Sequence, residues 1–250
     1  MNIAILFAGG VGRRMGSYRS TPKQFIEVDD KPIIIYTLEY FQAHRDIDAI
    51  YIACVSDWID HLEKLVGRWE ITKVRRIVAG GETAQHSIYN ALTAAREECG
   101  GDSIALIHDG VRPFITGRLI SDVIESVKKF GSAITCTPSY ETVIISMDEQ
   151  NIASVPPRKN MHSAQAPQAF PLDDIIAAHN EIRKINPAYE DVVDACTIYH
   201  QLGRKIHMVA GNRGNIKITR PEDVYMLKGL FEYRRGEEIL GITLLETGDE

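Results

Sequence analysis

Short apolar runs alternate with amphipathic stretches through most of the chain, and this alternation predicts its secondary structure. In the stretch after residue 118, Leu119, Val123 and Val127 recur at helical spacing, and Gly131 supplies a helix stop. The runs typical of buried strands are Ile3–Phe7, Ala49–Cys54, Val74–Val78, Ile104–His108 and Ala133–Thr137. Strands alternating with helices predict an α/β fold: a mostly parallel, Rossmann-like sheet with helices on both faces.

One segment departs from this alternation. Thr142–Met147 and Ile152–Val155 have the pattern of two short strands joined by a turn, and two prolines follow them. A two-stranded hairpin is only marginally stable alone. We therefore expect residues 139–158 to form a protruding β-hairpin arm that packs on a second copy of the chain. The remainder is expected to be a single domain over residues 1–235, followed by a C-terminal tail, 236–250.

The first predicted strand leads into a glycine-rich loop that carries cations. Its glycines and cations are Gly9, Gly10, Gly12, Arg13, Arg14 and, after Pro22, Lys23. Glycine lets the backbone approach a ligand closely, and exposed amides in such a loop make an anion-binding concavity. Arginine forks onto phosphate oxygens, while lysine adds a point charge. The loop is therefore predicted to bind a polyphosphate.

Two other glycine-loop motifs are broken in this sequence. The dinucleotide fingerprint needs a third glycine where this chain has Met15, and the Walker pattern needs a Gly-Lys-Ser/Thr that does not follow. The missing glycine weighs against a dinucleotide-dependent oxidoreductase. A surface turn with solvated arginines and a non-catalytic nucleotide-binding module are further alternatives.

Four motifs occur in order along residues 2–230. They are the loop Gly9–Gln24 and the segments His108–Phe114, Gln165–Gln168 and Gly214–Asp223. Together they resemble the CTP-dependent cytidylyltransferases that activate small polyol phosphates, which include ribitol 5-phosphate and 2-C-methyl-D-erythritol 4-phosphate enzymes. The resemblance implies a nucleotidyltransferase domain that transfers CMP from CTP to a polyol phosphate, releasing pyrophosphate and forming a CDP-alditol. It also implies Mg²⁺ as cofactor and a homodimer formed through the arm.

The resemblance assigns roles to individual residues. Those implied in catalysis are Arg14, Lys23, Asp109 and Lys217. Those implied in CTP binding are Ala8, Gly9, Gly10, Gly12, Arg13, Gly81, Glu82 and Ser87. Those implied in binding the acceptor are Arg112, Thr142, Arg158 and Lys217, with Arg158 reaching the neighbouring subunit's acceptor. Asp109 is also the candidate Mg²⁺ ligand, because hard oxygen ligands suit this ion.

Several of these positions have structural alternatives. Asp109 could cap the following turn, Arg112 could form an internal ion pair, and Ser87 could cap the helix that begins near it. Lys217 lies in an alternating run, Asn215–Thr219, which is typical of a strand and could present the lysine to solvent. These alternatives stay open at this point.

The predicted acceptor pocket departs from the methylerythritol enzymes that the chain resembles. Ala166 and Val193 stand where those enzymes carry hydroxyl side chains, and Glu82 and Glu141 stand where they often carry aspartate. A site built to bind hydroxyls discriminates through them. We therefore expect ribitol 5-phosphate as the acceptor, with methylerythritol 4-phosphate as the alternative.

Composition narrows the partners and the compartment. A net charge of −6 over 250 residues weighs against a general nucleic-acid surface. No apolar stretch has the length of a membrane span, and no signal-peptide pattern precedes the first strand. The four cysteines lack metal-ligand or disulfide spacing. We expect a cytoplasmic protein that binds neither nucleic acid nor membrane.

Overall fold

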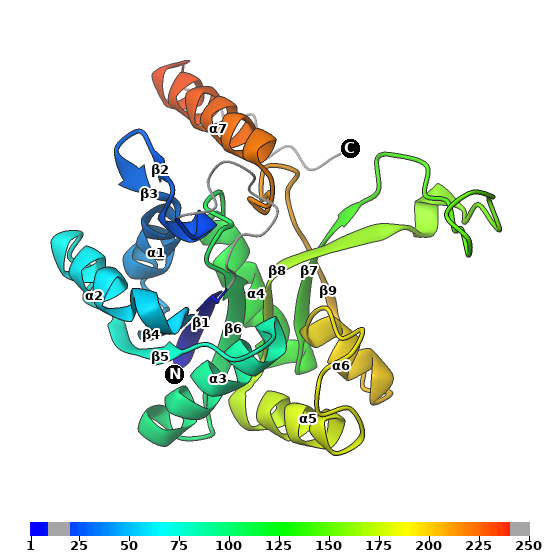
Figure 1. Ribbon diagram of the computed structural model, residues 1–250, viewed down its shortest axis with the longest axis horizontal. Helices are drawn as coiled ribbons and strands as arrows, with labels where there is room; N and C mark the ends of the chain where they lie inside the picture. Colours follow the sequence, from blue (N-terminus) through cyan, green and yellow to red (C-terminus); the bar gives the residue numbers. More distant parts are fainter. Residues whose placement is uncertain (10–20, 241–250) are drawn as a thin grey trace.

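The computed structural model describes residues 1–9 and 21–240, and its centre is a seven-stranded sheet of order β5-β4-β1-β6-β8-β7-β9 (Figure 1). The strands are β1 (Asn2–Ala8), β4 (Ala49–Cys54), β5 (Val74–Ala79), β6 (Ile104–Asp109), β7 (Ala133–Pro138), β8 (His162–Pro171) and β9 (Met208–Ala210). All five predicted strands are present. The predicted α/β class with a mostly parallel sheet is therefore confirmed.

Strand β8 runs against all its neighbours in this sheet. It pairs antiparallel with both β6 and β7, whereas the other strand pairs are parallel. The apolar pattern did not predict β8, because His162–Pro171 contains two prolines and several polar residues in place of an apolar run. The short strand β9 was also not predicted.

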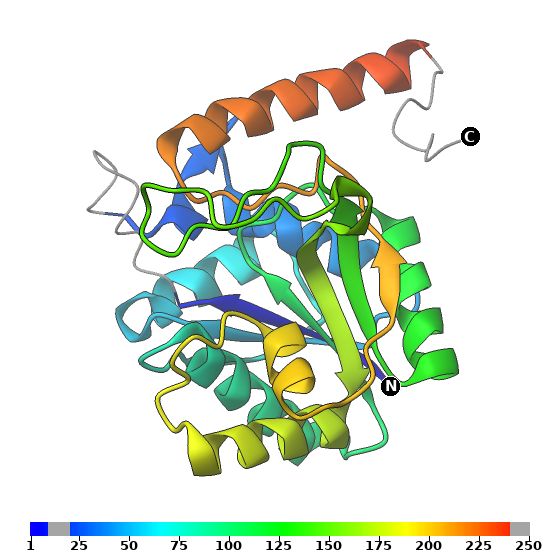
Figure 2. The same cartoon turned by 90° about the vertical axis from the view of Figure 1, so that its right-hand side faces the viewer.

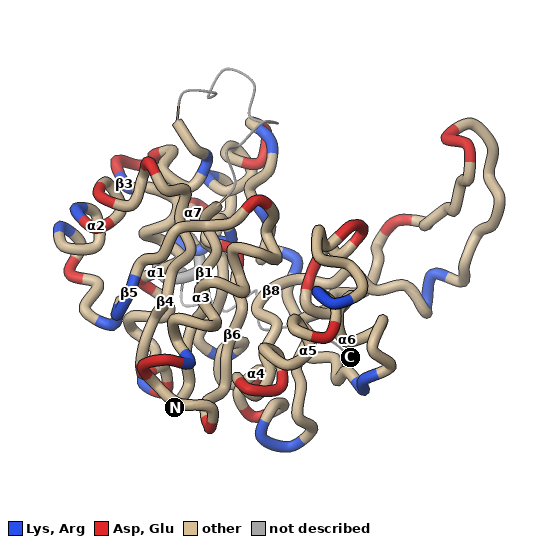
Figure 3. The backbone as a smooth tube through the Cα atoms, turned by 60° about the horizontal axis from the view of Figure 1, so that its bottom comes forward, with Lys and Arg blue, Asp and Glu red and all other residues tan. Residues whose placement is uncertain are grey.

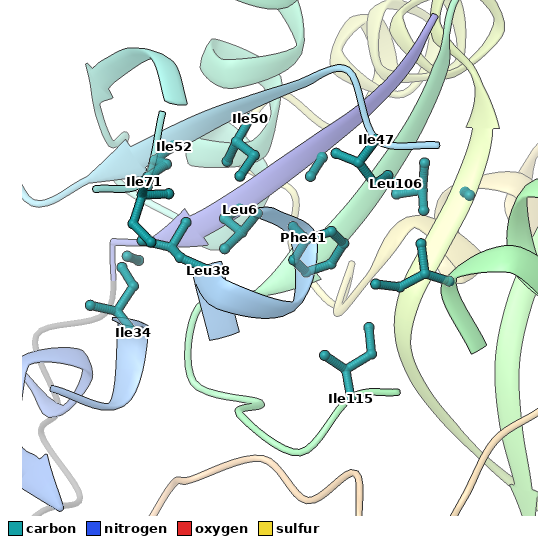
Figure 4. Close-up of a cluster of buried hydrophobic side chains, with 14 of the residues drawn as sticks. Leu6, Ile34, Leu38, Phe41, Ile47, Ile50, Ile52, Ile71, Leu106 and Ile115 are labelled. Atoms are coloured by element: carbon teal, nitrogen blue, oxygen red, sulfur yellow. The ribbon is translucent and has the colours of Figure 1, made fainter. Parts of the chain in front are cut away.

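Helices cover both faces of the sheet, as expected. Helices α1 (Ile33–Ala43), α2 (Ile59–Arg68) and α4 (Gly117–Phe130) cover one face, and α3 (Ala84–Cys99), α5 (Leu172–Ile185) and α6 (Ala195–Gln201) cover the other. On the first face Leu38 and Phe41 of α1 pack against Leu6 and Leu106 from the central strands (Figure 4). Burying these side chains provides the main driving force for the fold. Helix α4 ends at Gly131, whose φ of 77° is the left-handed conformation that glycine adopts easily.

A third, smaller apolar cluster attaches the C-terminal helix α7 (Pro221–Leu240) to the end of the sheet that carries the site. Figure 2 shows α7 lying across this end of the molecule. Val224 and Leu227 of α7 pack with Ile33 and Ile218, and the short strands β2 (Glu27–Val28) and β3 (Lys31–Pro32) lie beside them. Helix α7 begins at Pro221, since proline suits the first turn of a helix. None of the helices in the described part of the chain is long and apolar enough to cross a membrane.

The segment between β7 and β8 extends away from the body of the molecule (Figures 1 and 3). The two predicted strands of the arm are not formed: residues 142–155 contain one isolated antiparallel bridge, Ile145 to Ser154. Asp148 stabilises the turn between them by accepting hydrogen bonds from the amides of Gln150 and Asn151, at 3.0 and 2.8 Å. Met147 is 86% exposed and Ile152 is 61% exposed. Two strands without a packing surface are marginal, which accounts for the single bridge.

Candidate active site

The site lies where β1 and β6 end side by side. Phe7 of β1 is in register with Asp109, the last residue of β6, and the amide of Gly110 donates to the Phe7 carbonyl at 3.1 Å. In parallel sheets ligands bind beyond the carboxyl ends of the strands. The glycine loop and the Asp109 motif both follow directly after these strands, so they start from the same edge of the sheet.

Asp109 is buried between two cations. Its Oδ2 accepts from Arg112 Nε at 2.7 Å, and its Oδ1 lies 2.5 Å from Lys217 Nζ. Burial opposes ionisation of this carboxyl, but the charges of Lys217 and Arg112 outweigh it and hold the pKa of Asp109 well below its ordinary value. Asp109 is therefore a fixed negative charge at neutral pH.

His108, the residue before Asp109, contacts the backbone of Arg112. Its Nε2 lies 3.2 Å from the Arg112 carbonyl oxygen, and burial lowers the pKa of His108 to about 4. A neutral imidazole at neutral pH adds no charge beside Asp109. His108 therefore has a structural role beside Asp109.

A cavity of about 380 Å³ opens beside Asp109 on the side of α3. Its walls are Phe7, Ala8, Gly9, Lys23, Gln24, Gly81, Glu82, Thr83, Ala84, Ser87, Asp109, Val111 and Lys217. The structure thus brings together eight residues predicted for CTP binding or catalysis: Ala8, Gly9, Lys23, Gly81, Glu82, Ser87, Asp109 and Lys217. The other predicted members of this group, Gly10, Gly12, Arg13 and Arg14, lie outside the described residues. We call this space the nucleotide cavity.

Ser87 organises the backbone on one wall of the nucleotide cavity. Its Oγ accepts from the Gly81 amide and donates to the Thr83 carbonyl, each at 3.0 Å. A Cβ on Gly9 would come within 2.9 Å of the same oxygen, which explains the need for glycine there. The alternative role of Ser87 as helix cap is wrong, because Thr83 caps α3 by accepting from the His86 amide.

Lys23 and Gln24 enter the nucleotide cavity from one short 3₁₀ turn, η2 (Lys23–Phe25). Lys23 Nζ donates to the Ile218 carbonyl at 3.0 Å, and Gln24 Nε2 donates to the Ala8 carbonyl at 2.6 Å. The turn therefore ties the end of β1 to the segment that carries Lys217. Gln24 ends the glycine-loop motif, and its role in tying this turn to β1 was not predicted from the sequence.

A second cavity, of about 240 Å³, lies on the other side of Asp109. Its walls are Phe7, Gln85, Ile88, Ile107, Asp109, Arg112, Ala164, Gln165, Ala166, Gln168, Val193, Asp194, Ala195 and Lys217. Arg112, which was predicted to bind the acceptor, lines this cavity. It also forms the internal ion pair, with Asp109, that was the alternative to that role. Phe7, Asp109 and Lys217 border both spaces. We call this second space the acceptor cavity.

The polar wall of the acceptor cavity is held in one orientation by internal hydrogen bonds. Gln168 Nε2 donates to Asp194 Oδ2 at 2.9 Å, while Gln168 Oε1 accepts from the Cys196 amide at 3.0 Å. Asp194 caps α6 through its other oxygen, and Gln85 Nε2 donates to the Val193 carbonyl at 3.1 Å. Sequence reasoning did not assign roles to Gln85, Gln168 or Asp194. The place of Gln168 in a quoted motif was the available signal.

Two predicted acceptor residues are not brought to either cavity within one chain. Thr142 and Arg158 are both exposed on the arm, and neither is among the residues that line the two spaces. The structure contains one chain, so their predicted reach toward a neighbouring subunit stays a prediction.

Lys217 reaches the site from a segment without regular secondary structure. The strand predicted over Asn215–Thr219 is wrong, because its backbone pairs with no strand. Its amide and carbonyl groups bond instead to separate parts of the site, such as Ile218 N to the Val111 carbonyl at 2.9 Å. The alternation of apolar and polar residues follows from Ile218 facing the third apolar cluster, while Lys217 faces the cavities.

The described acidic side chains offer one candidate ligand for Mg²⁺. Among residues 1–9 and 21–240, no group of three or more His, Cys, Asp or Glu side chains could hold a metal ion. Asp109 alone places an ionised carboxylate on the border of both cavities. One carboxylate fits an ion whose other ligands are phosphate and water oxygens, the usual arrangement for Mg²⁺ beside a nucleotide.

Comparison with known proteins identifies the family. The sequence model described as IspD, 2-C-methyl-D-erythritol 4-phosphate cytidylyltransferase, matches residues 2–231. The chain belongs to the IspD cytidylyltransferase family. The protein is therefore a nucleotidyltransferase, and the oxidoreductase and non-catalytic alternatives are set aside.

Individual relatives extend along almost all of the chain. A ribitol-5-phosphate cytidylyltransferase from Streptococcus agalactiae serotype V is 45% identical over 242 residues, covering 97% of this chain and 100% of that protein. One from Vibrio parahaemolyticus serotype O3:K6 is 42% identical over 241 residues, covering 96% and 100%.

Solved structures of the IspD family share the fold. The 4-diphosphocytidyl-2C-methyl-D-erythritol synthase of Anaerococcus prevotii superimposes with a TM-score of 0.79 at 28% identity, covering 93% of this chain and 96% of that one. The 2-C-methyl-D-erythritol 4-phosphate cytidylyltransferase of Thermus thermophilus has a TM-score of 0.72 at 24% identity, covering 91% and 98%. The second likeness bears on the fold alone.

Proposed function

We propose that the protein transfers CMP from CTP to ribitol 5-phosphate, forming CDP-ribitol and pyrophosphate. The observation that carries this proposal is the shared wall of Asp109 and Lys217 between a nucleotide cavity and an acceptor cavity. Because both cavities border the same ion pair, a nucleotide in one cavity and an acceptor in the other would lie next to each other at Asp109 and Lys217. The choice of ribitol is supported by the relatives of 45% and 42% identity that carry that name.

Methylerythritol 4-phosphate is the second candidate acceptor, supported by the family description and the structural neighbours. The acceptor cavity weighs against it. Ala166 and Val193 both line this cavity, where the methylerythritol enzymes have hydroxyl residues. Fewer hydroxyl contacts are available to read that substrate.

In the proposed reaction a phosphate oxygen of the acceptor forms a new bond to the α-phosphorus of CTP. The bond from that phosphorus to the bridging oxygen breaks, and pyrophosphate leaves with the electron pair. The attacking phosphate is already an anion, so positioning and charge stabilisation supply the catalysis. We propose that Lys23, which lines the nucleotide cavity, binds the triphosphate, and that Lys217, which borders both cavities, binds the acceptor phosphate.

Asp109 keeps Lys217 and Arg112 oriented toward the acceptor cavity through its two ion pairs. It is also the residue that would hold Mg²⁺, together with the triphosphate. When bound, the ion would neutralise charge on the phosphates and help to align them. We propose Mg²⁺ as the cofactor because Asp109 is ionised and borders both cavities.

We further propose a homodimer formed through the arm. The arm protrudes from the body of the molecule with exposed apolar side chains, of which Met147 and Ile152 are examples. A partner surface would bury them and complete the strand pairing that one chain lacks. We place the reaction in the cytoplasm, since all four cysteines are free thiols, as is usual in a reducing compartment.

The test is pyrophosphate release by the purified protein with each of the four common nucleoside triphosphates and a panel of polyol phosphates. We expect turnover with CTP and Mg²⁺, and a kcat/KM for ribitol 5-phosphate at least tenfold above that for methylerythritol 4-phosphate. Tenfold corresponds to about 1.4 kcal/mol of transition-state binding. A preference for methylerythritol 4-phosphate would overturn the acceptor assignment, and preference for another nucleotide would overturn the CTP assignment.

A further inference from the structure

The segment that carries Lys217 needs anchors, because it has no strand partners of its own. One backbone anchor is the bond from Ile218 N to Val111, and Lys23 binds the Ile218 carbonyl from the nucleotide side. On the acceptor side the anchor is the side chain of Asn215, two residues before Lys217. Asn215 is thus a side-chain anchor close to Lys217 in the sequence and on the acceptor side of the segment.

Asn215 is completely buried and binds two parts of the acceptor cavity wall. Its side-chain Nδ2 donates to the Ala166 carbonyl at 2.6 Å, and its backbone carbonyl oxygen accepts from Arg112 Nη1 at 2.7 Å. Arg112 in turn donates to Asp109, the partner of Lys217. Asn215 thus connects strand β8, the Asp109 ion pairs and the Lys217 segment.

Asn215 lines neither cavity itself. Ala166 and Arg112, to which it binds, line the acceptor cavity and not the nucleotide cavity. Any effect of Asn215 on the reaction must therefore act through the groups it holds. Lys217 borders both cavities, but the direct partners Ala166 and Arg112 belong to the acceptor cavity alone, so the effect should fall mainly on the acceptor.

We propose that Asn215 is a positioning residue that fixes Lys217 and Arg112 for binding of the acceptor phosphate. This role rests on the proposed function, since it specifies how the acceptor end of the same site is held. The side-chain amide is required because only a donor satisfies the buried Ala166 carbonyl. A carboxylate of the same shape would place negative charge against that carbonyl oxygen, and alanine would leave it unpaired.

The test compares Asn215→Ala and Asn215→Asp with wild type in steady-state kinetics, varying CTP and the acceptor separately. We expect the acceptor KM to rise by about tenfold or more in both variants, since each leaves a buried carbonyl without its donor. The KM for CTP should change less than about threefold, because the nucleotide cavity keeps its own anchors. Having two variants keeps the test decisive if one of them does not fold.

The matched control is Ser126→Ala, which removes another buried hydrogen bond, from Ser126 Oγ to the Ser132 carbonyl, in a part of the fold outside both cavities. It should lower the melting temperature without changing either KM. If the Asn215 variants behave like this control, Asn215 is merely structural and the proposal is wrong. An equal rise in both KM values would also overturn it.

Failure of the proposed function would give a different result. The acceptor used is whichever polyol phosphate the wild-type protein turns over fastest. If that acceptor is not ribitol 5-phosphate, the acceptor assignment fails, while the comparison of the two KM values still judges Asn215. Calorimetric binding of CTP to each variant provides a readout that does not depend on turnover, and it should match wild type within about threefold.

Discussion

The nucleotide cavity and the acceptor cavity meet at Asp109 and Lys217 but are built from different kinds of structure. The nucleotide cavity is lined by the end of β1, the turn η2 and the segment from Gly81 to Ser87 that leads into α3, where Ser87 and Gln24 hydrogen-bond to backbone groups of these segments. The acceptor cavity is lined by side chains of β8 and of segments far apart in the sequence. Segments tied together by backbone hydrogen bonds are hard to change one residue at a time, whereas side chains can be exchanged singly. Acceptor specificity is therefore expected to change more easily than nucleotide specificity.

The largest expected effect is on the nucleotide side. Lys23→Ala should lower kcat by roughly a hundredfold to a thousandfold, because a fixed cation is lost where charge develops on the phosphates. Single-turnover rates at saturating substrates measure this loss. The matched control is Lys64→Ala on the exposed face of α2, which should leave the rate unchanged. Near-normal turnover of the Lys23 variant would show that Lys23 is not a catalytic residue.

Acidification should loosen the acceptor side through a buried histidine. Burial lowers the pKa of His179 to about 3, and its Nδ1 lies 2.8 Å from the hydroxyl of Tyr189, in the loop before Val193. Below pH 6.5 the unfolded chain takes up a proton that the folded chain excludes. Stability therefore falls as pH decreases from 6.5 toward 3, by up to about 1.4 kcal/mol per pH unit from this group.

Urea unfolding of wild type and His179→Gln at pH 7, 6 and 5 measures this contribution. The variant should lose less stability on acidification than wild type. His108, with a pKa lowered to about 4, adds a second contribution that the variant retains. Exposed His200 supplies the control, and His200→Gln should keep the wild-type pH dependence. Identical pH dependence in all three proteins would show that His179 is protonated equally in both states.

A smaller effect should separate the acceptor from CTP. Arg158→Ala should raise the acceptor KM by about tenfold, because a cation on the arm of one subunit is proposed to reach the acceptor of the other. The KM for CTP should stay close to wild type. Lys159→Ala, at the neighbouring exposed position, is the control. Sedimentation of the wild-type protein as a monomer at micromolar concentration would contradict the subunit-crossing role.

The smallest effect should come from one acceptor-cavity side chain. Val193→Thr restores a hydroxyl and should improve the relative use of methylerythritol 4-phosphate by a few-fold, less than about tenfold, since one exposed hydroxyl adds little binding energy. Competition between the two acceptors at saturating CTP measures the ratio. Ile185→Thr, an equally exposed position outside the cavity, should leave it unchanged. An unchanged ratio in both variants would mean that Val193 does not contribute to selectivity.

Local sequence patterns were sufficient to predict the elements whose structure depends on neighbouring residues. The five parallel strands and the Gly131 helix stop follow from short apolar runs and from one glycine conformation. The residues Ala8, Gly9 and Asp109 could be placed together because the ends of neighbouring parallel strands must meet. Strand β8 could not be predicted from its apolar pattern, because its sequence is rich in proline and polar residues. Its strand conformation is stabilised by hydrogen bonds to the neighbouring strands β6 and β7.

The sequence by itself determined the α/β class, the family and the residue types at the site, since apolar periodicity and ordered motifs are properties of the chain alone. Only the tertiary structure decided that Asp109 is paired with both Arg112 and Lys217, and that it separates two cavities. It also decided that Asn215–Thr219 is held by scattered hydrogen bonds and not by a strand partner. The physical reason is that ion pairing and burial depend on distances between segments far apart in the sequence, as with Arg112 and Asn215 at a separation of 103 and Lys23 and Ile218 at a separation of 195.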